Sequence, residues 1–285
     1  MVPTAVRTTF RTLSAAAPPL AVGLGARTFT RVGPPARVRS IDAETHGAAR
    51  CATVEVDGDS VVTSSWGAAP QSGAPAVLLV HGWQLRASRF GFLVRALVEA
   101  GWRVESYDAP AHGDSTGDRL TVLEHMAAMR AVEAAHGPFT AVVGHSLGAF
   151  SAATALHDGF AADRFVSLAA PTGFDSVVAS FMRLAGISPR LHDRLCDRIA
   201  RTGFPDETDL RDRFDLCRHP VPARVSTLFV QDLDDTMHSA DEARALHAAH
   251  PGSELLITSG LGHNRIMDDE TVVKTVVDHL GPARS

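Results

Sequence analysis

The sequence predicts an α/β fold in which a mostly parallel sheet is flanked by helices. From Ala49 onward, short strand-like runs alternate with helical stretches, as they do in successive βαβ units. Some runs, such as Ala76–Val80, are apolar throughout, which is typical of strands covered by helices on both faces. One segment, Thr172–Pro220, contains no strand-like run. These observations together predict a sheet-centred core with a helical insertion.

Eight runs carry the strand prediction. Cys51–Asp57 and Ser60–Trp66 meet at Asp57-Gly58-Asp59, a spacing that predicts a hairpin. The other six runs are Ala76–Val80, Trp102–Tyr107, Thr140–Val143, Phe165–Leu168, Thr227–Val230 and Glu254–Thr258. The helices expected between them are Phe92–Ala100, Val122–Ala135, Ala149–Asp158, Ala240–His250 and Thr271–Leu280.

The strandless segment has the pattern of an amphipathic helix. Leu191, Leu195 and Ile199 recur every four residues and define one apolar face. A neighbouring row is charged, and comprises Arg190, Arg194 and Arg198 with Asp193 and Asp197 beside them. We interpret the segment as a small helical subdomain with a solvated, salt-bridged face, a description that also suits a cap over an active site.

The chain is divided accordingly. We expect a helical or irregular segment at 1–48, a core at 49–171 and 221–285, and a helical cap at 172–220. The apolar stretch Leu13–Ala26 is short for a bilayer span and contains Pro18 and Pro19. We therefore expect it to form a helix lying on the body of a cytoplasmic protein.

Composition excludes several classes of function. The 285 residues carry a net charge of −5, which gives no basic footprint for nucleic acid or an anionic membrane. The three cysteines, Cys51, Cys196 and Cys217, form no CxxC pair, so neither a zinc site nor a disulfide framework is indicated. The partner expected is a small molecule, and the sequence has no signal for an oligomeric state.

The strongest chemical signal is Gly144-His145-Ser146-Leu147-Gly148, a G-x-S-x-G pentapeptide. It follows an apolar strand and precedes an alanine-rich helix. A serine on such a sharp strand-to-helix turn is raised clear of the sheet, and the turn requires very small neighbours. Ser146 is therefore the expected nucleophile.

A nucleophilic serine needs a base and an acid that orients the base. His263 lies in a glycine-containing loop just after the last predicted strand, and Asp235 follows the strand Thr227–Val230. The order Ser…Asp…His and the position of both residues after carboxyl ends of strands fit a triad. Asp234 and Asp175 remain alternatives to Asp235 as the acid.

The transition-state oxyanion requires two hydrogen-bond donors. The amide of Leu147 is free at a helix N-terminus, and the loop His81–Gln84 supplies the amide of Trp83 as the second donor. Gln84 is also a candidate for the substrate pocket. The segment Asp108–Ser115 is interpreted as a structural turn, and histidines other than His263 as surface or structural residues.

With these motifs in place, the sequence resembles the α/β-hydrolase superfamily from Ala49 to Leu280, and within it the small bacterial esterase-like members. The resemblance rests on HGWQ at 81–84, DAPAHGDS at 108–115, GHSLG at 144–148, DLDD at 232–235 and GLGH at 260–263. It implies an eight-stranded sheet with a helical cap after strand six, and no metal or organic cofactor. Thr236 and Ser239 stand where the family often has prolines. The alignment of the DLDD motif with the family's acid motif indicates Asp235 as the acid.

These expectations converge on a serine hydrolase that cleaves a carboxylic ester or thioester through an acyl-enzyme. The alternatives are a slow or non-catalytic ligand-binding member of the fold, and an acyltransferase or C–C hydrolase variant. Phe181, Met182 and Leu184 of the cap are expected to line the acyl or leaving-group pocket. An apolar pocket of this kind favours uncharged, medium-sized substrates.

Overall fold

The centre of the molecule is one eight-stranded sheet. The computed structural model describes residues 4–69 and 72–283. The strands are β1 (Arg50–Val56), β2 (Asp59–Trp66), β3 (Ala76–Val80), β4 (Arg103–Tyr107), β5 (Ala141–His145), β6 (Arg164–Leu168), β7 (Ser226–Asp232) and β8 (Glu254–Thr258). They lie in the order β1-β2-β4-β3-β5-β6-β7-β8, and β2 alone runs in the direction opposite to the other seven strands.

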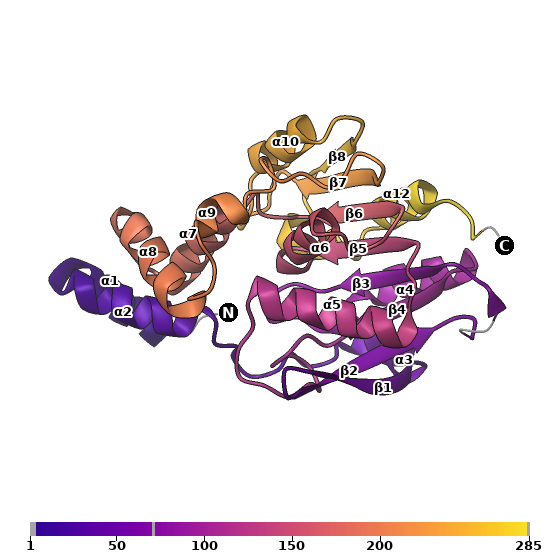
Figure 1. Cartoon of the computed structure of the whole chain (residues 1–285), viewed down its shortest axis with the longest axis horizontal. Coiled ribbons are helices and arrows are strands. Elements are labelled where there is room, and N and C mark those ends of the chain that lie inside the picture. Colours follow the sequence, from indigo (N-terminus) through magenta and orange to yellow (C-terminus); the bar gives the residue numbers. More distant parts are fainter. Residues whose placement is uncertain (1–3, 70–71, 284–285) are drawn as a thin grey trace.

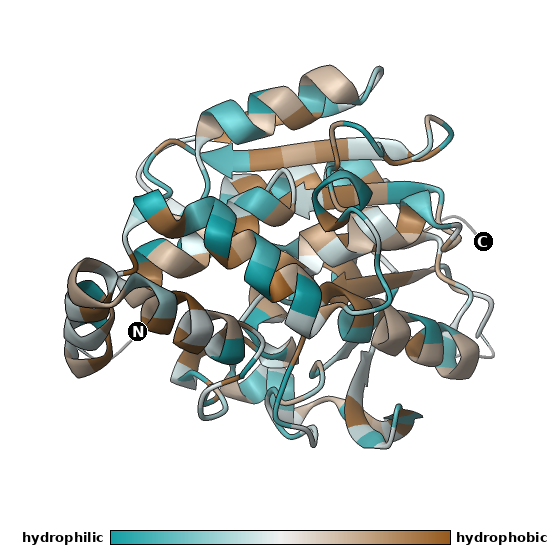
Figure 2. Ribbon diagram, turned by 60° about the vertical axis from the view of Figure 1, so that its left-hand side comes forward, coloured by the Kyte–Doolittle hydropathy of each residue, from teal (hydrophilic) through white to brown (hydrophobic). Residues whose placement is uncertain are grey.

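Helices cover both faces of this sheet (Figure 1). The helices of the core are α4 (Gly91–Glu99), α5 (Val122–His136), α6 (Leu147–His157), α10 (Ala240–Ala249), α11 (Gly262–Arg265) and α12 (Glu270–Leu280). Apolar side chains of α5 and α6 belong to one buried cluster, and those of α4 and α12 belong to another on the opposite face. Figure 2 shows the same amphipathicity as brown and teal segments alternating along the helices.

The eight predicted strands and the helices between them are all confirmed, with ends that differ by at most two residues. Two differences have a physical cause. The helix predicted from Ala149 begins at Leu147, because the turn at the serine leads directly into helical backbone. The predicted hairpin turns at Asp57 and Gly58, both with positive φ (51° and 90°), the backbone that a tight two-residue hairpin requires.

The cap predicted for Thr172–Pro220 is helical. It contains α7 (Phe174–Ala185), the 3₁₀ turn η4 (Pro189–Leu191), α8 (His192–Gly203) and α9 (Leu210–Arg213). The predicted apolar face of α8 is buried, because Leu195 and Ile199 pack into the larger core cluster.

The N-terminal segment contributes two further helices to this region. They are α1 (Thr4–Ala16) and α2 (Pro18–Phe29), and Figure 1 shows them beside α7 and α8, at the left-hand side of the view. The contact is close, because a Cβ added at Gly25 of α2 would lie 3.1 Å from Ile187 and 3.2 Å from Leu195. The short η1 (Ser40–Asp42) and α3 (Ala43–Gly47) instead pack near α4. Across the described residues, no helix combines the length and apolar character needed to span a bilayer.

Candidate active site

Ser146 occupies a strained corner between β5 and α6. Its backbone has φ 55° and ψ −123°, a conformation rare for a residue with a side chain. The corner is closed by close approaches at two glycines. A Cβ at Gly144 would lie 2.4 Å from Ala149 Cα, and one at Gly148 would lie 2.2 Å from Val80 O. Only glycine fits these positions, which explains the G-x-S-x-G spacing.

The structure brings Ser146, His263 and Asp235 together at the carboxyl edge of the sheet. His263 Nε2 lies 3.0 Å from Ser146 Oγ, and His263 Nδ1 lies 2.8 Å from Asp235 Oδ2. The side chain of Asp235 is fully buried and that of His263 is 16% exposed. A serine, a histidine and a carboxylate in this chain of contacts can deprotonate the hydroxyl and stabilise the resulting imidazolium.

Asp235 is held as a carboxylate. Its Oδ1 accepts from the amides of Met237 (2.6 Å) and His238 (3.2 Å), and its Oδ2 also accepts from Gln231 Nε2 (2.9 Å). Burial raises the pKa of Asp235, but the hydrogen bond from His263, its charge and these other donors outweigh burial and lower the pKa to about 2.

The two neighbouring carboxylates of the same loop have other contacts. Asp232 is buried and accepts from Thr258 Oγ1 (2.8 Å) and from the amides of Leu261 (3.1 Å) and Gly262 (2.8 Å). It therefore braces the turn that carries His263, a role that the sequence did not reveal. Asp234 is exposed, and its Oδ2 accepts from the amide of Gly260 (2.6 Å).

Trp83 and Leu147, whose amides are the predicted oxyanion donors, line the same cavity as Ser146. Leu147 is the first residue of α6, so its amide has no acceptor within the helix. The loop before Trp83 approaches the corner very closely. A Cβ at Gly82 would lie 2.9 Å from both His145 O and Ser146 Cβ.

Neutral histidines hold this loop in position. His112 Nε2 accepts from the amide of Gln84 (2.9 Å), and His81 Nε2 accepts from the amide of Ala109 (2.9 Å). Burial lowers the pKa of His112 to about 4 and that of His81 well below its usual range. The rings therefore remain uncharged acceptors, and the segment Asp108–Ser115 serves the loop through His112 and Ala109.

A cavity of about 110 Å³ opens beside Ser146. Its wall is largely apolar and comes from the cap, the core and the N-terminal segment. The principal apolar lining residues are Phe29, Trp83, Phe150, Phe174, Val177, Phe181, Leu184, Phe204 and Phe214. The polar side chains in the wall, apart from Ser146, are Thr121, Ser180 and His238.

Two of the four residues predicted for the pocket line this cavity, namely Phe181 and Leu184. Met182 does not, because it projects from another face of α7 and lines a groove beside α1. Gln84 does not either, because its positive φ (53°) carries an exposed side chain toward Gly33. Both placements differ from the sequence prediction.

Several lining residues were not predicted, Phe29 and His238 among them. Phe29 of α2 packs edge-on against Phe181, with ring centroids 5.3 Å apart. Nothing in the local sequence links residue 29 to a serine more than a hundred residues away. His238 was grouped with structural histidines, although it stands only three positions after Asp235. That spacing was the available signal.

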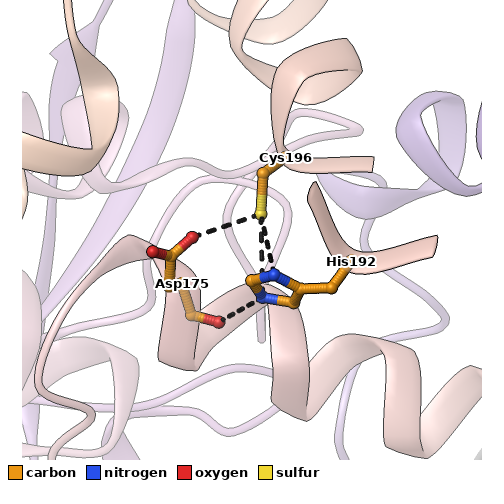
Figure 3. Close-up of side chains that lie close together, drawn as sticks. All are labelled: Asp175, His192 and Cys196. Carbon is orange, nitrogen blue, oxygen red and sulfur yellow. Dashed lines mark hydrogen bonds between the residues drawn. The ribbon is translucent and has the colours of Figure 1, made fainter. Parts of the chain in front are cut away.

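Asp175 lies in the cap and contacts a different histidine from His263. Figure 3 shows its carboxylate beside Cys196 Sγ (3.4 Å), with His192 Nε2 3.7 Å from the same sulfur. The three side chains have the residue types and separations of a three-ligand metal site. However, Arg211 Nε lies 3.2 Å from the carboxylate, and burial together with Asp175 raises the pKa of Cys196 to about 12. These features favour a hydrogen-bonded link between α7 and α8, and the absence of a metal stays a prediction.

The sheet order and the serine at a strand–turn–helix corner define an α/β-hydrolase fold. A sequence model described as the alpha/beta hydrolase family matches residues 77–275, and the chain belongs to that family. No curated protein matches the sequence significantly. Family membership makes hydrolase the general class of the protein.

Solved structures of related fold include an esterase, a putative lipase and a thioesterase domain. An esterase of Pyrococcus furiosus has 20% identity and a TM-score of 0.64, with 87% of this chain and 98% of the esterase covered. A putative lipase of Acinetobacter baumannii has 16% identity and a TM-score of 0.63 (87% and 97% covered). A thioesterase domain from the curacin biosynthetic pathway has 19% identity and a TM-score of 0.58 (80% and 99% covered). At these identities the likeness shows the fold alone.

Proposed function

We propose that the protein is a serine hydrolase that cleaves a carboxylic ester or thioester. The observation that carries the proposal is the continuous contact from Ser146 Oγ through His263 to Asp235, with distances of 3.0 and 2.8 Å. The apolar cavity beside the serine supports an uncharged acyl or alcohol group as the part of the substrate that binds there.

The reaction begins with attack of Ser146 Oγ on the carbonyl carbon, while His263 Nε2 takes the hydroxyl proton. The oxyanion of the tetrahedral intermediate faces the amides of Trp83 and Leu147, each donor being worth about 2.7–4 kcal/mol in such sites. Collapse expels the alcohol or thiol, which receives the proton from His263. Water then attacks the acyl-enzyme and loses a proton to His263. The bond between the acyl carbon and Ser146 Oγ breaks, Oγ takes the proton back from His263, and the carboxylic acid is released.

The backbone of His263 is held in place by a second histidine, His145. His145 Nε2 donates to His263 O over 2.8 Å. Burial lowers the pKa of His145 well below its usual range, and the neighbouring His263 lowers it further. A neutral His145 places no second positive charge next to the imidazolium that forms on His263 during attack.

The test uses a fluorophosphonate probe together with 4-nitrophenyl esters of two to ten acyl carbons. The wild-type protein is expected to be labelled and to hydrolyse the shorter esters, and Ser146→Ala is expected to lose both properties while its melting temperature stays close to wild type. Folded wild-type protein that is neither labelled nor active would refute the proposal in favour of a ligand-binding member of the fold. Activity in Ser146→Ala within tenfold of wild type would place the nucleophile elsewhere.

A further inference from the structure

A second histidine–carboxylate pair lies in the wall of the cavity. His238 is 4% exposed, and its ring centroid lies 5.5 Å from that of His263. Its Nδ1 lies 3.8 Å from Glu242 Oε2 and 3.4 Å from Ser176 Oγ. The proposed triad uses none of these three side chains.

The hydrogen bonds around Glu242 determine which nitrogen of His238 carries the proton. Ser176 Oγ donates to Glu242 Oε1, and the amide of Ser239 donates to Oε2 over 2.9 Å. Burial raises the pKa of Glu242, but the bonds from His238, Ser176 and Ser239 outweigh it and lower the pKa to about 2. An ionised carboxylate only accepts, and the hydroxyl of Ser176 is already directed at it. The Nδ1 atom of His238 therefore carries the hydrogen.

The other ring nitrogen is consequently an acceptor. With the hydrogen on Nδ1, Nε2 has a lone pair. In the described part of the chain, the hydrogen bonds of His238 involve its Nδ1, its amide and its carbonyl, and none involves Nε2. The remaining polar groups of the wall are committed. Ser180 Oγ donates to Met237 O over 2.9 Å, and Thr121 Oγ1 bonds with Glu124 in a helix cap.

We propose that His238 forms a hydroxyl-binding subsite, so that the preferred substrate carries a hydroxyl group near the scissile ester. The proposal deepens the proposed hydrolase function and rests on it for the identity of the ester. The lone pair of Nε2 accepts the hydroxyl hydrogen, and Glu242 with Ser176 holds the ring in the tautomer that can do so. A hydroxyl is favoured over a carboxylate because the surrounding wall is apolar and would leave an anion largely unsolvated.

The position of His238 is coupled to the triad through the backbone. Its amide donates to Asp235 Oδ1 over 3.2 Å, and its carbonyl accepts from Gln231 Nε2 over 2.9 Å. A substrate group bound at His238 Nε2 is therefore held at a fixed position relative to Ser146. His238 acts here as a positioning residue for the substrate.

The experiment compares matched ester pairs that differ by one hydroxyl. One pair carries it on the acyl side (4-nitrophenyl 3-hydroxybutyrate against 4-nitrophenyl butyrate), and the other on the alcohol side (2-hydroxypropyl butyrate against propyl butyrate). Dissociation constants are measured by calorimetry on Ser146→Ala, and kcat and KM on the wild type. A hydrogen bond of about 0.5–1.5 kcal/mol predicts a preference of roughly two- to tenfold for the hydroxylated member of at least one pair.

Three variants of the binding-competent protein test the role of His238. In the Ser146→Ala background, His238→Phe is expected to abolish the preference. His238→Gln is expected to restore part of it, because the amide oxygen can accept a hydrogen bond near the former Nε2 position. Ser180→Ala, a change at another polar residue of the wall, is expected to retain the preference.

Equal binding of both members in both pairs would overturn the subsite, as would a preference that survives His238→Phe. A preference lost equally in Ser180→Ala would also overturn it, since the cause would then be a general disturbance of the wall. If the wild type hydrolyses no ester but Ser146→Ala shows the His238-dependent preference in binding, the subsite stands and the proposed hydrolase function fails.

Discussion

Replacing Asp235 by asparagine removes the negative charge beside His263 and leaves the volume of the side chain at position 235 almost unchanged. The carboxylate accepts two hydrogen bonds at each oxygen. The donors are the amides of Met237 and His238 at Oδ1, and His263 Nδ1 and Gln231 Nε2 at Oδ2. Asparagine has one amino group, and either orientation of the amide sets that group against two donors.

The cost follows from this geometry. If the amino group faces His263, the imidazole must adopt the tautomer whose proton is on Nε2, and it can no longer accept the proton of Ser146. A loss of kcat of up to about 10⁴-fold is expected, as for a triad histidine held in the wrong tautomer. Each donor left without an acceptor in the buried site also costs about 1–3 kcal/mol of unfolding free energy.

The assay combines kcat and KM on 4-nitrophenyl butyrate with thermal unfolding, at a temperature where the variant is fully folded. Asp234→Asn and Asp175→Asn are the matched controls, because both carboxylates are exposed. Asp234 lies next to Asp235 in the loop after β7, and Asp175 lies in α7. Each is expected to stay within about threefold of wild type, as surface changes usually do. Activity of Asp235→Asn within tenfold of wild type, or a larger loss in either control, would refute the assignment of the acid.

Two further predictions concern the cavity, and a third concerns the free energy of unfolding at acid pH. Phe181→Ala with Leu184→Ala should shift the preferred acyl length upward, measured as kcat/KM across 4-nitrophenyl esters, because both residues line the cavity; an unchanged profile would remove α7 from the binding wall. Phe29→Ala should also shift the preferred acyl length upward, and an unchanged preference would exclude α2 from the pocket. The pKa of Asp235 and that of Glu242 are both lowered to about 2 from 3.8 and 4.5. Their stabilisation is therefore present above about pH 4.5 and lost as pH falls to 2, and urea unfolding of Asp235→Asn should be less pH-dependent in this window than that of the wild type.

The core and the chemical centre were predictable because their signals are local. A run such as Ala76–Val80 is apolar at every position because helices cover both faces of its strand, so the burial pattern can be read without knowing the partners. The G-x-S-x-G turn is a short contiguous motif. Gly144 is required by a contact within the turn, with Ala149, whereas Gly148 is required by the neighbouring strand, at Val80 O. Parallel strands then bring the residues after β7 and β8 to the same edge as Ser146.

The pocket was less predictable because α7 has two apolar stripes. Val177, Phe181 and Leu184 line the cavity, while Val178 and Met182 are buried on other faces of the helix. Helical periodicity separates the two stripes but does not indicate which one faces the serine. That choice depends on α1 and α2, which cover α7 and α8 and whose position no local pattern encodes.

The acidic loop after β7 shows how structure divides residues that look alike in sequence. Asp232, Asp234 and Asp235 occur within four positions and all accept hydrogen bonds. Asp232 accepts from backbone amides on the turn before His263, so its charge fixes where that histidine stands. Asp235 accepts from the imidazole itself, so its charge determines which tautomer the histidine adopts. Asp234 is exposed, and its carboxylate accepts a hydrogen bond from the amide of Gly260. The acid that we propose for the triad is therefore distinguished from its neighbours by the atom to which its carboxylate is directed, because local spacing alone leaves that choice open.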